Sequence, residues 1–310
     1  MSQLATYAAC VGITCVIQWG GFLAAFVLQT ETFYDVLGGV NFLCLALYTA
    51  TVPAEGMPDF SRDPHKLAMT CVFVCSRAWL LLFLAWRARE RGGDQRFDGV
   101  IGDFCHFLVF WTVQGIWVLA ISMPLLVVNS AETFRPRFDA GDWLFMLGFG
   151  LGVLLEVVAD VQKAVWVKQG RLGGFCRSGL WNYSRHPNYF GEMLQWWCAW
   201  GFAYSSASGP SDVLWWCSGI SPLFTMQILL NTPETGVAQA NGQGLKRYYE
   251  NPEVAAAYAE YRKNTSILIP LLGYKHVPLV LKRTLLLDLE RYEYKPSAQV
   301  GDGVVQSLLA

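Results

Sequence analysis

Charged residues are scarce in this chain. Asp, Glu, Lys and Arg make up 15% of its 310 residues, against roughly 25% in an ordinary soluble domain. The two signs nearly cancel, so the formal net charge is only -1, and no basic-aromatic patch or zinc-finger spacing occurs. Because such a chain has no positive field to attract phosphate backbones, nucleic acid is excluded as the expected partner.

Disulfide and metal-binding patterns are lacking as well. None of the nine cysteines belongs to a Cys-x-x-Cys pattern, and most lie within or beside apolar runs. We therefore expect free thiols that pack as small hydrophobic side chains. The four histidines stand far apart in the sequence, so no metal site is predicted from His65, His106, His186 and His276.

Hydrophobic sequence is what the chain has in abundance. Hydrophobic residue types account for 54% of it, and the mean hydropathy is +0.31. Several apolar stretches approach the ~20 residues that a helix needs to cross a bilayer. We predict an all-α, polytopic membrane helix bundle with about seven transmembrane helices, at Leu4–Leu28, Val36–Val52, Leu67–Trp86, Phe104–Val128, Trp143–Val167, Tyr189–Tyr204 and Val213–Leu230. The first stretch is long and has no basic residue before it, which favours a membrane helix over a cleaved signal.

Basic residues in the connections predict the orientation. They gather after the third stretch, after the fifth and in the C-terminal region, at Arg87, Arg89, Arg91, Arg96, Lys168, Arg171, Arg177, Arg185, Lys246, Arg247, Arg262, Lys263, Lys282 and Arg283. The opposite connections carry only Arg62, Lys66, Arg135 and Arg137. Since basic loops stay on the cytosolic side, we expect the C-terminus on the cytosolic or matrix side and the N-terminus opposite.

The chain becomes polar and rich in Gly and Pro beyond Leu230. We interpret residues 230–295 as a membrane-apposed part of one domain that covers residues 1–295, with a helix around Pro252 to Lys263. Residues 296–310 are predicted to form a flexible tail.

Three ionisable residues share one face of the fifth stretch. Glu156, Asp160 and Lys163 follow at i, i+4 and i+7. Two interpretations stay open: a wall of a polar ligand cavity, or an internal ion-pair ladder near the membrane surface. Three interpretations stay open for Arg77 in the third stretch: its side chain could extend to the membrane surface, pair with a carboxylate or line the cavity.

Glycines precede this polar face in the pattern LGFGLGV. A dinucleotide fingerprint would require a surrounding βαβ unit, which the sequence does not predict. We expect close helix packing through Gly148 and Gly152 instead.

The densest polar motif is GLWNYSRHPNYFGE, from Gly179 to Glu192. Pro187 suits the first turn of a helix, which then carries Asn188 and Glu192 on one face. Free backbone N–H groups at the helix start, together with Arg185 and His186, favour binding of a phosphate or another anion. The alternative is an interfacial elbow whose Trp and Tyr residues form an aromatic belt.

This motif, extended to GLWNYSRHPNYFGEMLQWW, resembles the signature of the steroid 5-alpha-reductase-like membrane proteins, particularly the DUF1295 branch. Further segments resemble that branch in the same order, and the resemblance covers Thr30 to Tyr294. These segments are TETFYDVLGGVNF, RARERGGDQRFD, FWTVQGIWV, EVVADVQK and YAEYRKNTSILIP.

The resemblance implies a seven-helix reductase that uses NADPH to reduce an activated carbon–carbon double bond in a steroid-like or other lipid, in the endoplasmic reticulum or another organellar membrane. By resemblance, Asn188 and Glu192 lie at the nicotinamide end, Asp160 helps to hold the cofactor, and the C-terminal part closes over it. The full set implied for the cofactor is Asp160, Lys163, Arg185, His186, Asn188, Glu192, Arg247 and Tyr248, with Tyr189 and Glu192 as catalytic residues and Tyr189 as the candidate proton donor.

The N-terminal helices depart from the steroid enzymes. Those relatives bind the enone oxygen of the substrate with a glutamate and a tyrosine. Glu31, Tyr34, Tyr48 and Glu55 do not match that local pattern. The expected substrate is therefore a lipid of a broader class than the steroids.

Two alternative functions compete with a reductase. Isoprenylcysteine carboxyl methyltransferases, which use S-adenosylmethionine, carry a similar Arg-His-Pro, Tyr and Glu pattern before a membrane helix. A third hypothesis is a non-catalytic subunit of a larger membrane assembly. Basic residues converging on the site favour NADPH, whereas a carboxylate and aromatic rings around a small cavity favour a sulfonium.

Overall fold

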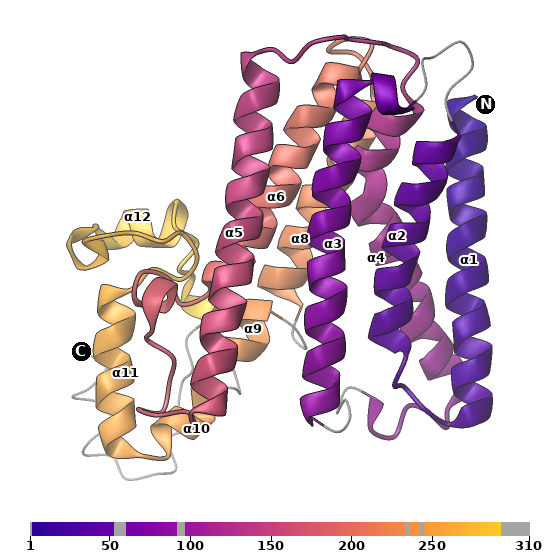
Figure 1. Ribbon diagram of the computed structural model, residues 1–310. Helices are drawn as coiled ribbons and strands as arrows, with labels where there is room; N and C mark the ends of the chain where they lie inside the picture. Colours follow the sequence, from indigo (N-terminus) through magenta and orange to yellow (C-terminus); the bar gives the residue numbers. More distant parts are fainter. Residues whose placement is uncertain (1, 53–59, 92–96, 233–235, 242–244, 293–310) are drawn as a thin grey trace. The chain divides into compact units, whose positions relative to one another are not determined.

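The described part of the chain is built from helices. The computed structural model describes residues 2–52, 60–91, 97–232, 236–241 and 245–292 (Figure 1). Within these ranges the extended pairing is confined to one isolated parallel bridge, Ser184 with Ser266. The helices are α1 (Gln3–Leu28), α2 (Tyr34–Thr51), α3 (Pro64–Arg91), α4 (Phe104–Ser130), α5 (Ala140–Lys168), α6 (Pro187–Ala203), α7 (Val213–Ser218), α8 (Ile220–Asn231), α9 (Gly236–Asn241), α10 (Lys246–Tyr249), α11 (Pro252–Asn264) and α12 (Leu279–Thr284). The predicted all-α class is confirmed.

Five segments of the described chain are long and apolar enough to cross a membrane. They are Gln3–Leu28, Pro64–Arg87, Phe104–Ser130, Ala140–Lys168 and Val213–Ala238. The chain is therefore a polytopic membrane protein. The predicted count of seven is not confirmed: the other two stretches coincide with α2, which has 18 residues, and α6, which has 17, and neither is among the five candidate spans.

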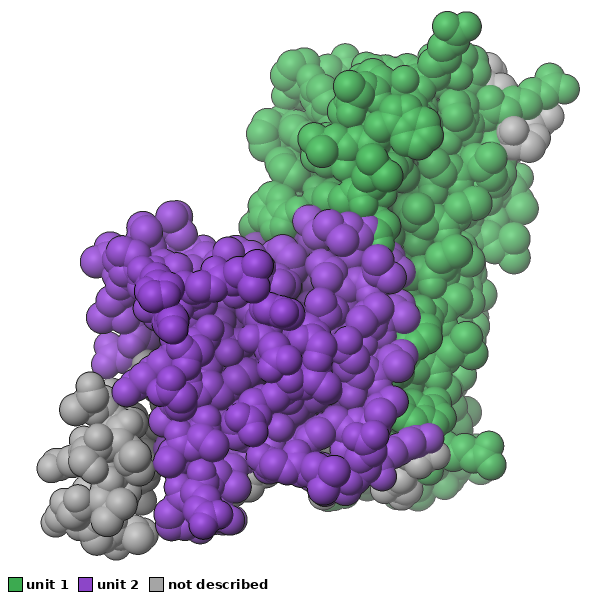
Figure 2. Space-filling view, turned by 60° about the vertical axis from the view of Figure 1, so that its left-hand side comes forward, with its two compact units in different colours: residues 1–150, 196–224 green, residues 151–195, 225–310 purple. Residues whose placement is uncertain are grey.

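The chain divides into two compact units (Figure 2). Unit 1 comprises residues 1–150 and 196–224, and unit 2 comprises residues 151–195 and 225–310. The prediction of one domain over residues 1–295 stays a prediction. Residues 296–310, Glu55, Arg96 and the side chains of Arg91 and Arg247 lie outside the described part of the chain.

Unit 1 buries several polar side chains between its helices, where each needs a hydrogen-bond partner. Asn41 lies between α1 and α2, accepting a 3.0 Å hydrogen bond from Gln18 and donating one of 3.2 Å to Thr14. Asn129 on α4 donates to Thr49 and Thr70, each at 2.9 Å. These buried bonds fix the register of the helices, because each side chain would otherwise leave polar atoms unpaired.

Arg77 does not snorkel to a membrane surface. Its side chain is fully buried in unit 1, and its guanidinium donates a 3.0 Å hydrogen bond to Ser76. The guanidinium carbon lies 4.7 Å from the ring centre of Trp196 and 5.5 Å from that of Phe42. Both aromatic faces stabilise the buried positive charge.

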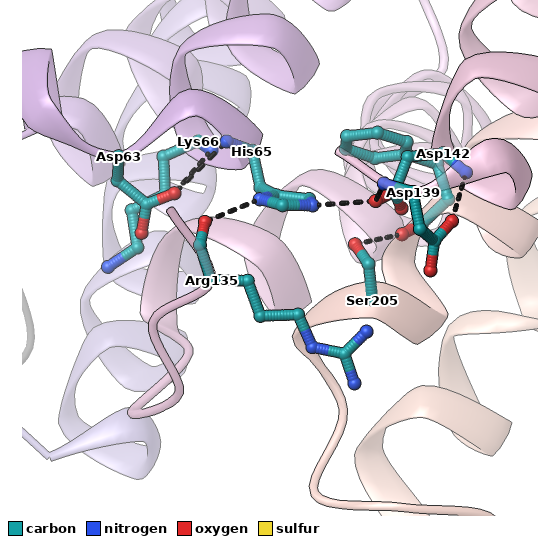
Figure 3. Close-up of polar contacts among 8 residues, drawn as sticks. Asp63, His65, Lys66, Arg135, Asp139, Asp142 and Ser205 are labelled. Atoms are coloured by element: carbon teal, nitrogen blue, oxygen red, sulfur yellow. Dashed lines mark hydrogen bonds and ion pairs between the residues drawn. The ribbon is translucent and has the colours of Figure 1, made fainter. Parts of the chain in front are cut away.

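A polar cluster ties the start of α3 to the start of α5 (Figure 3). The buried ring of His65 lies 3.0 Å from Asp142 Oδ2 through Nε2 and 3.2 Å from the carbonyl oxygen of Arg135 through Nδ1. Asp63 accepts hydrogen bonds from the backbone N–H groups of His65 and Lys66, and so caps α3. The ring of His65 therefore joins α3 both to α5 and to the backbone that precedes α5.

Unit 2 has its own apolar clusters. Met193, Leu230, Val237, Ile267, Leu268 and Tyr292 form one, and Phe175, Leu245, Tyr258 and Tyr261 form another. The helix predicted around Pro252 to Lys263 is confirmed as α11, which Asn251 caps by accepting from the N–H groups of Glu253 and Val254. The segment after Leu230 thereby packs against the start of α6.

Candidate functional site

The candidate site lies in unit 2, where α5 and α6 approach closely through glycine. A Cβ atom at Gly152 would lie 2.7 Å from the carbonyl oxygen of Gly191, and one at Gly191 would lie 2.6 Å from that of Gly152. Only glycine fits such a contact without a shift of the backbone. In unit 1, a Cβ at Gly148 would meet the Cys198 sulfur at 2.6 Å. The packing role predicted for Gly148 and Gly152 is confirmed.

Two polar rungs connect the helices beyond this contact. Gln195 Nε2 donates to Glu156 Oε2 at 2.6 Å, and Asn188 Nδ2 donates to Asp160 Oδ1 at 3.1 Å. Glu156 and Asp160 are both buried. The polar face predicted for α5 thus meets a polar face of α6, and the side chains come together because the glycine contact brings the backbones near.

Two buried polar atoms at the start of α6 have no hydrogen-bond partner among the described residues. They are Nε2 of His186 and Oδ1 of Asn188. Native proteins leave few buried groups unpaired, so each such atom calls for an explanation, and a bound ligand is one. An imidazole nitrogen and an amide oxygen two residues apart suit a group that both donates and accepts hydrogen bonds, such as a carboxamide.

His186 is a neutral imidazole. Its burial, with the nearby charges of Lys163 and Arg185, lowers the pKa of His186 from 6.5 to about 3, although a polar contact with the Asn241 side chain opposes the shift. The ring stacks on Tyr189 with 5.1 Å between centroids and 2° between planes. The neutral ring therefore acts through hydrogen bonding and stacking, not as a cation.

The segment before α6 is docked on α5. The short 3-10 helix η3 (Gly179–Asn182) begins at Gly179, whose φ of +56° suits glycine. Leu180 N donates to Gln162 Oε1 at 2.9 Å, and Trp181 Nε1 donates to the Ala159 carbonyl at 3.0 Å. Lys163 Nζ lies 4.7 Å from the Trp181 ring centre. These contacts set the position from which α6 starts.

The C-terminal part of unit 2 holds the same segment from its other side. Arg185 N donates to the Ser266 carbonyl at 2.8 Å, and Leu271 N donates to the Tyr183 carbonyl at 3.2 Å. The Ser184 hydroxyl donates to the Leu268 carbonyl at 2.5 Å. Residues 183–187 are therefore clamped between α5 and residues 265–271.

Arg185 is engaged in a buried ion pair. Its Nη2 lies 2.6 Å from Asp288 Oδ2, and its Nε donates to the Thr265 carbonyl at 3.2 Å. The Tyr274 hydroxyl donates to the same carboxylate oxygen at 2.5 Å. Burial alone would raise the pKa of Asp288, but Arg185 and Tyr274 lower it below its ordinary value. The carboxylate consequently stays charged and holds the arginine in place.

The other residues implied for the cofactor lie in unit 2 in different settings. Glu192 is half-buried on α6, and Lys163 is exposed beside Trp181. Tyr248 packs in the aromatic cluster, 4.9 Å from Tyr258 and 5.9 Å from Phe175 between ring centroids. Asp160 and Asn188, two of the residues implied for the cofactor, are joined by a direct hydrogen bond that the sequence did not predict.

Sequence reasoning missed Gln195, Gln162 and Asp288. A glutamine in an apolar helix, as in MLQWW and ADVQK, is a usable signal, because a buried amide needs partners. The signal for Asp288 was weaker: it is the first acidic residue after the stretch 271–287, whose charged residues are all basic. Among the described residues, no group of three His, Cys, Asp or Glu side chains is arranged to hold a metal ion.

Comparison with known proteins identifies the family. The family model described as "Protein of unknown function (DUF1295)" matches residues 21–265. The chain belongs to the DUF1295 family. Both polar rungs of this DUF1295 protein lie inside the matched region, whereas Asp288 lies beyond it.

One curated relative shares part of the sequence. The protein described as "Steroid 5-alpha-reductase DET2" from Solanum lycopersicum is 27% identical over 141 residues, which is 45% of this chain and 51% of that protein. The chain therefore matches about half the length of that relative. No solved structure matches the chain.

Proposed function

We propose that this DUF1295 protein is an NADPH-dependent reductase that saturates an activated carbon–carbon double bond in a steroid-like or other lipid. The similarity to a steroid 5-alpha-reductase supports the reaction class. The cofactor assignment rests on the Asn188–Asp160 hydrogen bond, which uses the amide nitrogen of Asn188 and leaves its Oδ1 atom without a partner in the described chain. The nearby Nε2 atom of His186 is also buried without a partner there.

These residues fit the nicotinamide end of the cofactor. Asn188 Oδ1 would accept a hydrogen bond from the nicotinamide carboxamide, because Asp160 fixes the orientation of the Asn188 amide. His186 Nε2 and Glu192 would offer further polar contacts, and we assign Lys163, Tyr248 and Arg247 to the phosphate and ribose end. A bound NADPH would supply the hydride.

The chain itself supplies the proton and excludes water. Reduction of a double bond adds one hydride and one proton across it, and Tyr189 is the proposed proton donor. Its ring is held parallel to that of His186. Arg185 acts as a positioning residue, because its ion pair with Asp288 fixes the backbone from which His186 and α6 begin.

The cytosolic or matrix side of an organellar membrane, such as the endoplasmic reticulum, is the proposed location of this site. The basic residues that follow α3 and α5 support that orientation.

The test is nucleotide binding by the purified full-length chain in detergent. We expect NADPH to bind, and Asp160→Ala and Glu192→Gln to weaken binding by about tenfold or more, the equivalent of about 1.4 kcal/mol or more. Val161→Ala is the matched control, since its half-exposed apolar side chain lies next to Asp160 on α5. If both carboxylate variants bound NADPH as tightly as the unsubstituted protein does, the cofactor assignment would be removed.

The same assay separates the alternatives. Binding of S-adenosylmethionine in place of NADPH would favour methyl transfer. Binding of neither, by a protein with a normal melting transition, would favour a non-catalytic subunit.

A further inference from the structure

Large apolar side chains gather on the surface of unit 2 around α12. Leu272 is 82% exposed, Leu279 65%, Val280 70% and Leu285 69%. Such a group is larger than the single exposed apolar residues that soluble surfaces normally carry. These residues lie outside the five candidate membrane spans.

The charged residues of the segment that carries these side chains are all basic. Residues 271–286 contain Lys275, Lys282 and Arg283 and no Asp or Glu. An apolar face with flanking cations is the composition of a helix that lies in the interface of a membrane containing anionic lipids.

The fold holds the segment so that its apolar side chains point outward. Tyr274 is buried beneath it and donates to Asp288, while Lys282 Nζ lies 4.2 Å from the Tyr274 ring centre. Arg283 Nη1 donates to the Asp288 carbonyl at 2.6 Å. Because these anchors are the polar and aromatic groups, Leu279, Val280 and Leu285 remain on the surface.

The position of α12 in unit 2 indicates what covers this surface. Figure 1 places α10 and α12 at opposite ends of α11, with α10 on the side of the unit where α5 ends. The α5 helix is itself a candidate membrane span that finishes at Lys168. The opposite end of the unit, where its share of α5 begins, therefore faces the bilayer, and α12 lies at that end.

We propose that residues 271–286 form a monotopic membrane anchor, in which Leu272, Leu279, Val280 and Leu285 insert into the leaflet and the basic residues bind anionic lipid headgroups. The occupant is the bilayer that the chain's own helices cross. The anchor holds unit 2 against the leaflet independently of α5, and it does not depend on reductase activity.

Photo-crosslinking of the full chain in lipid nanodiscs tests the anchor. Val280 is replaced by the photoreactive residue benzoylphenylalanine, with Leu285 as a second position in case the first variant folds poorly. Leu172 is the matched control, because it is 71% exposed but follows the other end of α5. We expect lipid adducts at positions 280 and 285 and none at 172.

A second arm tests the basic residues. In nanodiscs of mixed phosphatidylserine and phosphatidylcholine, Lys275→Gln should lower the ratio of serine to choline adducts at position 280 by about fivefold, equivalent to about 1 kcal/mol. An unchanged ratio would overturn the role of charge. Lipid adducts absent at both apolar positions, or adducts with another protein there, would overturn the anchor itself.

Discussion

Arg185 and Asp288 form a 2.6 Å ion pair across 103 residues of sequence. The arginine belongs to the densest polar motif of the chain, and the aspartate follows the basic α12 segment. The pair therefore joins the segment before α6 to the C-terminal part of unit 2. The pair and the bond to the Thr265 carbonyl use Nη2 and Nε of the guanidinium in contacts within the chain.

Asp288→Asn should lower the free energy of unfolding by about 3–5 kcal/mol. The change leaves the Arg185 charge buried without its counter-ion, which is more destabilising than the absence of both partners. Thermal unfolding in detergent measures it. Glu253→Gln, at an exposed carboxylate in the first turn of α11, should cost at most about 1 kcal/mol. Equal losses in the two variants would contradict the buried pair.

Unfolding should depend on pH through His186. The folded state keeps this ring neutral down to about pH 3, whereas the unfolded chain binds a proton near pH 6.5. The contribution of the neutral His186 ring to the free energy of unfolding is thus complete above pH 6.5. It is lost by about 1.4 kcal/mol per pH unit as the pH falls from 6.5 toward 3. His186→Gln should flatten the fall in melting temperature between about pH 6.5 and pH 5, and parallel curves would refute the buried neutral ring.

Gly152→Ala should destabilise the packing of α5 on α6 by about 1–3 kcal/mol, because the new methyl group meets backbone of Gly191 and the Gln195 side chain. Gly150→Ala is the control: nothing lies within 4 Å of a Cβ there, so alanine should stabilise the helix by up to about 1 kcal/mol. Chemical denaturation of the two variants checks the opposite signs.

Two substitutions of Asp142, the partner of the His65 ring, should destabilise the protein to different extents. Asp142→Leu leaves a buried ring nitrogen unpaired and should cost about 1–3 kcal/mol. Asp142→Asn should cost much less, because the new amide donates to Nε2 of a neutral ring while Nδ1 still donates to the Arg135 carbonyl. Melting temperatures of the two variants decide the matter, and similar losses would mean that the ion pair, not the hydrogen bond, is required.

The helices and the polar face of α5 could be predicted from the sequence, because lipid imposes long apolar runs and makes each buried charge conspicuous. The glycine contact followed from the same logic, since small residues four apart mark close packing. The number of membrane spans could not be predicted in this way, because α2 and α6 are close to the minimum length that a helix needs to cross a membrane.

The partners of the site residues were harder to foresee. Asp160 with Asn188 pairs residues 28 apart, and Arg185 with Asp288 pairs residues 103 apart. Local spacing carries no information about such contacts, which depend on how α5 meets α6 and on where the C-terminal part folds back. Arg185 illustrates this: its position before a helix suggested an anion contact, while tertiary packing gave it a carboxylate of its own chain.

The clamp on residues 183–187 by residues 265–271 imposes an order of assembly. During synthesis, α5 and the start of α6 leave the ribosome well before residues 265–271 do. Until then the start of α6 has only its α5 contacts, so the nascent protein holds an open half-site. The contacts from Ser266, Leu268 and Leu271 therefore form late, and a chain shortened before residue 265 would leave the backbone around His186 without them.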